Sequence, residues 1–516
     1  MAKRKRESAE DASHGTNGVK KSKADTIATS NSSSAPPQIH AQIITGSYER
    51  ILHGITASIP LQVLSSSNAD VTDPSAEPKS SAETSSEPIV TFADTFLFNA
   101  HASSIRCLAL SPPSASSSKV LLATGSTDTH INLYSLSTAV PQATPSLGTT
   151  TAPNPRNKAL GRLLQHTGAV TALAFAPRTK LLSSGADNSV VVTRTRDWAP
   201  LSAMRAPAPK PSANASASAS SDIAAGVNAF AVHPSHKIML AVGRAERCLR
   251  LWNLVTGKRA GVLRFAGPVL AAVGEGRGAS GEGRCVRWDR EGEEFVVGFE
   301  KGVAVFGMDC RVKGVMRLSG RAKVQQCRYV DGLDGVVAVS TDDGRICFFS
   351  TADLDGTDVV DEEKSKAESI PQCRFLAQLG GQEAGIIGRV KDFTILQIPS
   401  DEEDEEASSK CLVVTGYSDG AIRVWFLNLQ ELNSSQPSTN GTEAHSAASD
   451  SEKPIINGNK DKTKLVGRLL GTYQTGNRIT CLTAFIMSGE ANNRPDADDT
   501  VGDAEVNSDS DSSDEE

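Results

Sequence analysis

The stretch CLVVTGYSDGAIRVW at residues 411–425 decides the fold of this chain. A β-branched, apolar run enters a polar turn at 416–419, and a second run with period-two alternation leaves the turn and ends on Trp425. This pattern predicts two antiparallel strands joined by a tight turn. Asp419 can accept hydrogen bonds from the turn amides, and Gly420 tolerates a positive φ angle.

The same unit recurs along the chain, and this recurrence indicates a repeat architecture. The other copies lie at 45–55, 124–134, 184–193, 242–252, 297–306 and 339–349. Every copy carries a carboxylate in its turn, for which we expect a structural role: Glu49, Asp128, Asp187, Glu246, Glu300, Asp343 and Asp419.

A second strand pattern accompanies the hairpins. It is found at 104–112, 169–177, 226–234, 283–291, 323–331, 388–396 and 477–485. The first hairpin precedes the first of these strands, and the last strand has no hairpin after it. The simplest resolution is a closed ring in which 477–485 pairs with the N-terminal hairpin, because closure removes exposed sheet edges. The sequence therefore predicts an all-β fold, a seven-bladed β-propeller over residues 39–487 with four strands in each repeat. In the first full repeat these strands are expected at 95–101, 104–112, 120–126 and 131–137.

The regions between and outside the repeats are polar and of low complexity. The turns are 42 to 79 residues apart, against about 40–45 for a four-stranded blade. We expect the excess to form long loops at 65–88, 138–158, 205–224, 274–283, 398–408 and 428–463. We also expect a disordered basic arm at 1–38 and a disordered acidic tail at 488–516.

Composition narrows the class of protein further. Hydrophobic residues make up 39% of the chain, which suffices for a core. We find no apolar run near the ~18 residues of a membrane helix and no signal peptide. The nine cysteines are scattered singly, and we interpret Cys107, Cys248, Cys347, Cys411 and Cys481 as small core residues in a reducing compartment.

Charge is unevenly distributed over the net −7 of the chain. Residues 1–23 carry seven Lys/Arg and three acids, whereas 490–516 carry eleven acids and one Arg. The basic clusters KRKR and KKSK suit a bipartite nuclear import signal. The alternative is a solvated arm that contacts RNA or nothing. The candidate import residues are Lys3, Arg4, Lys5, Arg6, Lys20, Lys21 and Lys23.

The acidic tail ends in NSDSDSSDEE, where serines lie among acids as acidophilic kinases prefer. The alternative is a tail that only increases solubility, and the two hypotheses do not exclude each other. The candidate phosphorylation sites are Ser508, Ser510, Ser512 and Ser513.

The chain shows no pattern typical of catalysis, cofactor binding or metal binding. GYSDG at 416–420 matches the GxSxG of serine hydrolases, but that motif needs a helix after the serine, and here a strand follows. The nine histidines lack metal-ligand spacing. His101 and His166 precede inner strands, and we expect them to hydrogen-bond Asp128 and Asp187. Trp252 and Trp425 are expected in the core.

The repeats resemble WD repeats, and the resemblance extends to one family. ITGSYERILHG, LAVGRAERCLRLWNLVTGKRAGVLRF at 240–265, GRVKDF at 388–393, TGYSDGAIRVW and RITCL at 478–482 occur in the order of the Mak-type, PAK-interacting WD-repeat proteins. This resemblance implies a seven-bladed WD-repeat propeller without enzymatic activity. It also implies assembly of the large ribosomal subunit in the nucleolus. The long inserts and the acidic tail depart from the family pattern.

Two hypotheses about function follow. The first is a scaffold that joins ribosomal proteins and assembly factors of pre-60S particles, as a monomer within a larger complex. Contact with pre-rRNA would then be electrostatic and salt-sensitive. The second is an adaptor that restrains a protein kinase activated by Rho-type GTPases. The basic arm favours the first hypothesis, and neither predicts a membrane partner or a cofactor.

Overall fold

The computed structural model describes residues 37–65, 89–114, 117–141, 151–207, 226–276, 278–355, 370–399, 409–433 and 464–488. These residues are almost entirely in strands, turns and loops, and the described strands belong to one compact unit that begins at Gln38. The described helices are short: α1 (Leu61–Ser65), α2 (Gly267–Ala272), α3 (Gln430–Asn433) and the 3-10 helix Gln382–Ala384. None of them is long and apolar enough to cross a membrane.

The two ends of the described chain meet in one four-stranded sheet of order β28-β1-β2-β3. Its strands are β1 (Gln38–Ser47), β2 (Ile51–Pro60), β3 (Thr91–Asn99) and β28 (Ile479–Ile486). β1 pairs antiparallel with β28, with Ile43 opposite Ala484. The predicted pairing of the C-terminal strand with the N-terminal hairpin is therefore confirmed.

Four further sheets have four antiparallel strands each. The first two contain β4 (Ile105–Leu110), β5 (Lys119–Ser126), β6 (Ile131–Ser137), β7 (Lys158–Leu163), β8 (Val170–Phe175), β9 (Lys180–Gly185), β10 (Ser189–Arg194) and β11 (Pro200–Arg205). The other two contain β12 (Val227–Val232), β13 (Ile238–Gly243), β14 (Cys248–Asn253), β15 (Lys258–Arg264), β24 (Val390–Gln397), β25 (Lys410–Tyr417), β26 (Ala421–Asn428) and β27 (Arg468–Gln474).

The remaining strands form one eight-stranded sheet of order β16-β17-β18-β19-β23-β22-β21-β20. They are β16 (Cys285–Trp288), β17 (Glu294–Gly298), β18 (Gly302–Gly307), β19 (Val312–Arg317), β20 (Val324–Tyr329), β21 (Val336–Thr341), β22 (Arg345–Asp355) and β23 (Gln372–Gly380). Within the described residues, the strand pairing between its two antiparallel halves is limited to the parallel pair of Val315 and Gln372.

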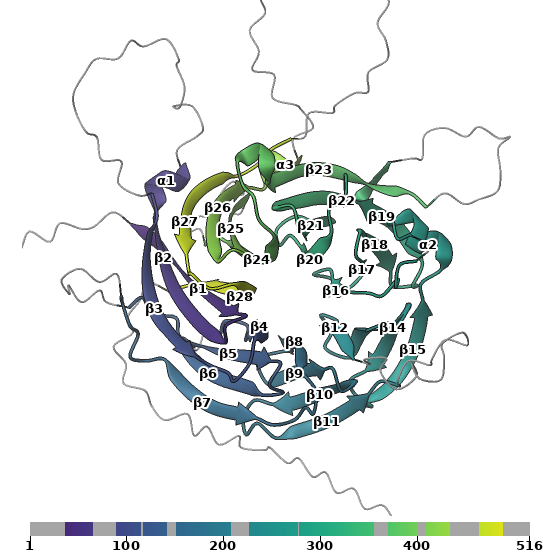
Figure 1. The fold of residues 1–516 in the computed structure, drawn as a ribbon, viewed down its shortest axis with the longest axis horizontal. Helices are drawn as coiled ribbons and strands as arrows, with labels where there is room; N and C mark the ends of the chain where they lie inside the picture. The colour runs from purple at the N-terminus through teal and green to yellow at the C-terminus, as the bar shows by residue number, and fades with distance from the viewer. Residues whose placement is uncertain are drawn as a thin grey trace, which may run out of the picture. The chain divides into compact units, whose positions relative to one another are not determined.

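The sheets are arranged in a ring, with one edge strand of each four-stranded unit innermost (Figure 1). The innermost strands contact one another in the order β4, β8, β12, β16, β20, β24 and β28, and β28 contacts β4 again. Buried apolar clusters lie between neighbouring four-stranded units, as where Ala338 and Phe348 pack against Val413 and Trp425. Since fully burying one such side chain contributes about 1.5–3 kcal/mol, each unit depends on its neighbours for its core.

Two boundary predictions need correction. The strand expected at 95–101 runs from Thr91 to Asn99 and pairs with β2, so the four strands of the first repeat are divided between two sheets. The strand expected to end on Trp425 continues to Asn428. In both cases hydrogen bonds with a neighbouring strand, and not the hydrophobic pattern, set the limits. Trp252 and Trp425 are buried, as predicted.

Candidate functional site: the hairpin turns and the central channel

All seven predicted turn carboxylates lie in hairpin connections at one face of the ring, which we call the turn face. They are Glu49 (β1–β2), Asp128 (β5–β6), Asp187 (β9–β10), Glu246 (β13–β14), Glu300 (β17–β18), Asp343 (β21–β22) and Asp419 (β25–β26). Gly420 has φ of 88°, as its turn requires. Thr129 and Asn188, which follow Asp128 and Asp187, also have positive φ angles, of 72° and 62°.

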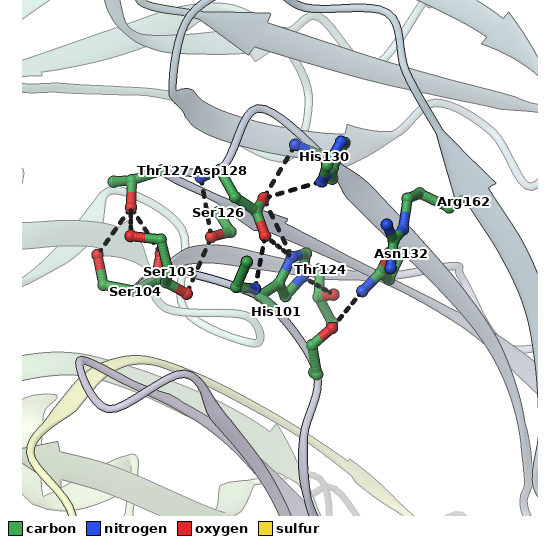
Figure 2. A network of polar contacts seen from close by, with 12 residues as sticks. His101, Ser103, Ser104, Thr124, Ser126, Thr127, Asp128, His130, Asn132 and Arg162 are labelled. Carbon is green, nitrogen blue, oxygen red and sulfur yellow. Dashed lines mark hydrogen bonds and ion pairs between the residues drawn. The ribbon is translucent and has the colours of Figure 1, made fainter.

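Asp128 is the centre of a polar network that spans one sheet (Figure 2). Its Oδ2 lies 3.1 Å from His101 Nδ1, and it accepts a hydrogen bond from Ala102 N at 2.9 Å. Its Oδ1 accepts one from His130 N at 3.0 Å. The other ring nitrogen of His101 lies 2.8 Å from Thr124 Oγ1. A neutral imidazole with its proton on Nδ1 satisfies both contacts, since it donates to the carboxylate and accepts from the hydroxyl.

The next sheet repeats this network. His166 Nδ1 lies 3.1 Å from Asp187 Oδ2, and His166 Nε2 lies 2.8 Å from Ser183 Oγ. Asp187 also accepts hydrogen bonds from Thr167 N at 2.9 Å and from Ser189 Oγ at 2.7 Å. The histidine–aspartate bonds that the sequence predicts are therefore present in both sheets.

These contacts shift the pKa values of the groups in the network. Burial lowers the pKa of His101, although the charge of Asp128 acts in the opposite direction. Burial by itself would raise the pKa of Asp128, but the hydrogen bonds from the backbone of His130 and Ala102 hold it below its ordinary value. Asp187 has a lowered pKa for the same reasons, with Ser189 as the strongest donor. The network is thus built for a neutral histidine and an ionised aspartate.

Three other turn carboxylates are held by arginine or lysine. Glu246 forms a bidentate ion pair with Arg250, whose side chain is buried. Glu300 pairs with Arg284 at 2.8 Å and with Lys323 at 2.6 Å, and Asp343 accepts from Arg345 Nε at 2.9 Å. The sequence reasoning missed these partners, although an arginine four residues after Glu246 and another two residues after Asp343 are visible in the sequence.

The last two turn carboxylates bind backbone groups. Asp419 Oδ1 accepts from Ala421 N at 3.1 Å, within its own turn. Glu49 Oε2 accepts from Arg478 N at 3.0 Å and so joins the first hairpin to the segment that leads into β28. Trp425 Nε1 donates to Thr415 Oγ1 at 3.2 Å. Thr415 is the equivalent of Thr124 and Ser183, whose hydroxyl groups contact histidines in the other two sheets.

The innermost strands line a central channel with a volume of about 860 Å³. Its wall combines small apolar residues such as Ala174 and Ala231 with charged side chains. Arg328 Nη2 pairs with Asp392 Oδ1 at 3.1 Å across two neighbouring innermost strands. Burial and the charge of Arg328 lower the pKa of Arg287 on the same wall. The channel therefore brings together cations from strands that are distant in the sequence.

Several predicted residues lie outside the part of the chain that the structure describes. These are the import candidates at positions 3–6, 20, 21 and 23, and the phosphorylation candidates at positions 508, 510, 512 and 513. Both sets stay predictions. Among the residues that are described, no group of three or more His, Cys, Asp or Glu side chains is arranged to hold a metal ion.

The nine cysteines are all described and are all free thiols. Cys347, Cys411 and Cys481 are buried in strands, as predicted, whereas Cys107 and Cys248 are only partly buried. The pair of buried thiols with the closest approach, Cys285 and Cys327 with Sγ atoms 3.1 Å apart, comes from two neighbouring innermost strands.

Known proteins match the chain in two ways. The family described as WD domain, G-beta repeat matches residues 92–135 and 157–193. These two segments hold most of the His101 and His166 networks, so the fold and the match define the chain as a WD-repeat protein.

Its similarity to individual proteins extends over most of the ring. The p21-activated protein kinase-interacting protein 1-like of Gallus gallus is 25% identical over 344 residues, which are 66% of this chain and 68% of that protein. Its Xenopus laevis counterpart is 23% identical over 394 residues, 76% of this chain and 75% of that protein. Protein MAK11 of Saccharomyces cerevisiae is 25% identical over 414 residues, 76% of this chain and 78% of that protein. These similarities support the resemblance to the Mak-type, PAK-interacting WD-repeat proteins that the motifs of the chain predict.

Proposed function

We propose that the chain is a non-enzymatic scaffold in the assembly of the large (60S) ribosomal subunit. The observation that carries this proposal is the similarity to Protein MAK11 over 76% of the chain, together with the family resemblance of its ordered motifs. WD repeats are typical of scaffolds, because a rigid ring offers several loop-lined surfaces at once. The expected partners are ribosomal proteins and assembly factors of pre-60S particles, with weak electrostatic contact to pre-rRNA.

The architecture that we propose for this scaffold is a closed, seven-bladed propeller over residues 39–487. Counting the two halves of the eight-stranded sheet as separate blades supports this number, since in the described part of the chain their strands are paired at one residue pair. The described residues also form seven buried apolar clusters, one between each two neighbouring units of the ring. The arm at 1–38 and the tail at 488–516 would flank the propeller as disordered segments.

Sedimentation of the tagged protein from nuclear extract on a sucrose gradient tests the proposal. Precursor RNA of the large subunit is probed across the fractions. We expect the protein to co-migrate with precursor particles, and mature large subunits to decline after its depletion. A protein confined to light fractions, with normal subunit ratios after depletion, would contradict an assembly role.

We propose a nuclear and nucleolar location for the protein. The basic arm supports import, because its two lysine- and arginine-rich clusters suit the acidic grooves of a carrier. Replacing the seven basic residues of the arm with alanine should reduce nuclear accumulation of a fluorescent fusion. Unchanged accumulation would retire the import hypothesis and leave the assembly proposal to the gradient experiment.

A second candidate function has its own supporting observation. The similar proteins from Gallus gallus and Xenopus laevis are named for interaction with a p21-activated protein kinase. An adaptor that restrains such a kinase should bind its regulatory region directly and lower its activity. If saturating amounts of purified protein leave the kinase activity unchanged, this second function is excluded.

A further inference from the structure

Four cationic side chains gather on the turn face where the central channel opens. Arg106 and Lys391 are the second residues of the innermost strands β4 and β24, and Arg389 and Arg478 directly precede β24 and β28. These three strands are consecutive in the ring, since β24 contacts β28 and β28 contacts β4. Thr480 Oγ1 joins the last two strands by donating to the carbonyl of Ile105 at 2.6 Å. We call this set of four side chains the basic mouth.

The charges of the basic mouth are not neutralised by ion pairs within the described part of the chain. Arg106, Arg389 and Arg478 are exposed, and Lys391 is half-buried with its Nζ 3.2 Å from the amide oxygen of Gln325. Burial lowers the pKa of Lys391, and the charges of Arg389, Arg478 and Arg106 lower it further, while the charge of Asp342 acts in the opposite direction. Like charges that gather without forming ion pairs favour the binding of an anion.

Nearby carboxylates are engaged with backbone groups. Glu49 accepts from Arg478 N, and Asp342 Oδ1 accepts from Lys323 N at 2.7 Å. The positive charge also continues inward, because Arg287 and Arg328 lie on the channel wall with Asp392 as their nearest acid. A ligand at the mouth therefore meets cations both on the rim and below it.

Two exposed apolar side chains flank the basic mouth. Tyr48 is 61% exposed in the β1–β2 turn, and Ile387 is 78% exposed in the loop before β24. One face of the Tyr48 ring is covered by the guanidinium of Arg478, 5.8 Å from the ring centre. Single-stranded RNA is usually held by aromatic rings that stack on its bases, and this surface offers one half-covered ring and an isoleucine. Exposed tyrosine and arginine beside an aliphatic anchor are instead typical of protein interfaces.

We propose that the basic mouth, with Tyr48 and Ile387 beside it, binds an acidic segment of a partner protein. The carboxylates of the segment would pair with Arg106, Lys391, Arg389 and Arg478, and an apolar side chain of the segment would pack against Ile387. This binding does not depend on the proposed role in ribosome assembly. It can be tested with the purified protein and a peptide, whichever assembly the chain joins.

Fluorescence anisotropy with the full chain tests the proposal. The probes are fluorescein-labelled nonaglutamate, the same peptide with a central leucine, and a labelled oligouridylate of twelve nucleotides. We expect both peptides to bind, the leucine-containing one more tightly. The double variant Arg106→Glu/Lys391→Glu should weaken peptide binding about tenfold or more, since like charges at an interface oppose binding. Ile387→Ser should remove only the advantage of the leucine.

Two control variants separate the basic mouth from general charge effects. Arg205→Glu/Arg264→Glu reverses two exposed charges on the outer strands β11 and β15, and replacement of the seven basic residues at positions 3–6, 20, 21 and 23 by serine removes the arm's charge. Both should bind the peptides as the unmodified chain does, and thermal unfolding checks that every variant is folded. An equal loss in either control overturns the proposal. The proposal is also overturned if neither peptide binds. It is overturned as well if the Arg106→Glu/Lys391→Glu variant loses binding of the oligouridylate but not of the peptides.

Discussion

The β4–β7 and β8–β11 sheets hold their turns differently from the β12–β15 sheet. In the first two, an aspartate binds a buried histidine, which in turn contacts a threonine or serine. In the third, Glu246 binds Arg250, and both side chains are almost buried. The turn in each case connects the second and third strands of its sheet, so one fold uses two kinds of polar contact at the same position.

The difference between the sheets coincides with the extent of the family match. The WD domain, G-beta repeat family matches only residues 92–135 and 157–193, the part of the chain with the histidine networks. The β12–β15 sheet has the same strand order and the same kind of hairpin without that match. The apolar strands and the turn thus build the sheet, and the histidine–aspartate bond is one of several ways to hold the turn.

The largest effect is expected from the ion pair. Replacing Glu246→Ala leaves Arg250, which is 7% exposed, as a buried charge without its partner, and this should cost about 3–5 kcal/mol of stability. Urea denaturation followed by tryptophan fluorescence would measure it. The double variant Glu246→Met/Arg250→Met should recover most of the loss, because no buried charge is left. If the double variant were as unstable as Glu246→Ala, the unpaired charge of Arg250 would not be the cause of the loss.

A smaller effect is expected in the histidine network. Asp187→Ala leaves the imidazole of His166, Thr167 N and Ser189 without their acceptor, and the loss should be about 2–3 kcal/mol since these groups can reach some water. The same denaturation experiment applies. Asp197→Ala, which removes an exposed ion pair with Arg194, serves as the control and should leave the midpoint unchanged. Equal midpoints for the two variants would contradict a stabilising role for the network.

Acid should lower the stability that the histidine network contributes. His101 has a lowered pKa, so the unfolded chain binds its proton more readily, and stability falls as the pH drops through the ordinary value of 6.5. Asp128 has a lowered pKa too, so its contribution is present above 3.8 and is lost as the pH falls further. Thermal unfolding between pH 7 and pH 3 would follow both steps. In His101→Asn the decline near pH 6 should be smaller, and an unchanged decline would assign it to other groups.

The smallest effect is expected at the partly exposed ion pair of Asp343 and Arg345. Asp343→Ala removes the partner of Arg345, but the arginine can be hydrated because its side chain is 17% exposed. The loss should be about 0.5–1 kcal/mol, as for other ion pairs near the surface, and it should shrink at high salt. Denaturation midpoints at low and high salt would measure it. A loss as large as that of Glu246→Ala would mean that burial does not decide the difference between the two pairs.

Much of the fold could be predicted because its signals are local. A β-branched run, a polar turn with a carboxylate and a second alternating run fall within about 15 residues in each hairpin. The unpaired strand at 477–485 and the unpaired hairpin at 45–55 together indicated closure, which the pairing of β28 with β1 confirms. The histidine–aspartate bonds were predictable because each histidine precedes an inner strand whose repeat also supplies the turn aspartate, although the separation is 27 residues in one pair and 21 in the other.

The division of the first repeat between two sheets was not visible in the sequence. The strand around Phe96 continues directly into His101 and β4, but its hydrogen bonds go to β2. Which sheet a strand joins depends on which sheet has an edge strand free to pair with it. A period-two pattern of apolar residues does not show which edge is free. The same holds for Arg250 and Arg345, since a sequence shows a charge but not its burial.

The sequence by itself determined the strands, the turns and the order in which they close, because each depends on residues within one hairpin or on a strand left without a partner. Only the tertiary structure decided where the charges gather. Arg106 and Lys391 are separated by 285 positions in the chain, yet closure of the ring places both at the opening of one channel. Electrostatic interaction acts through space, so such a surface exists only after the ring has formed.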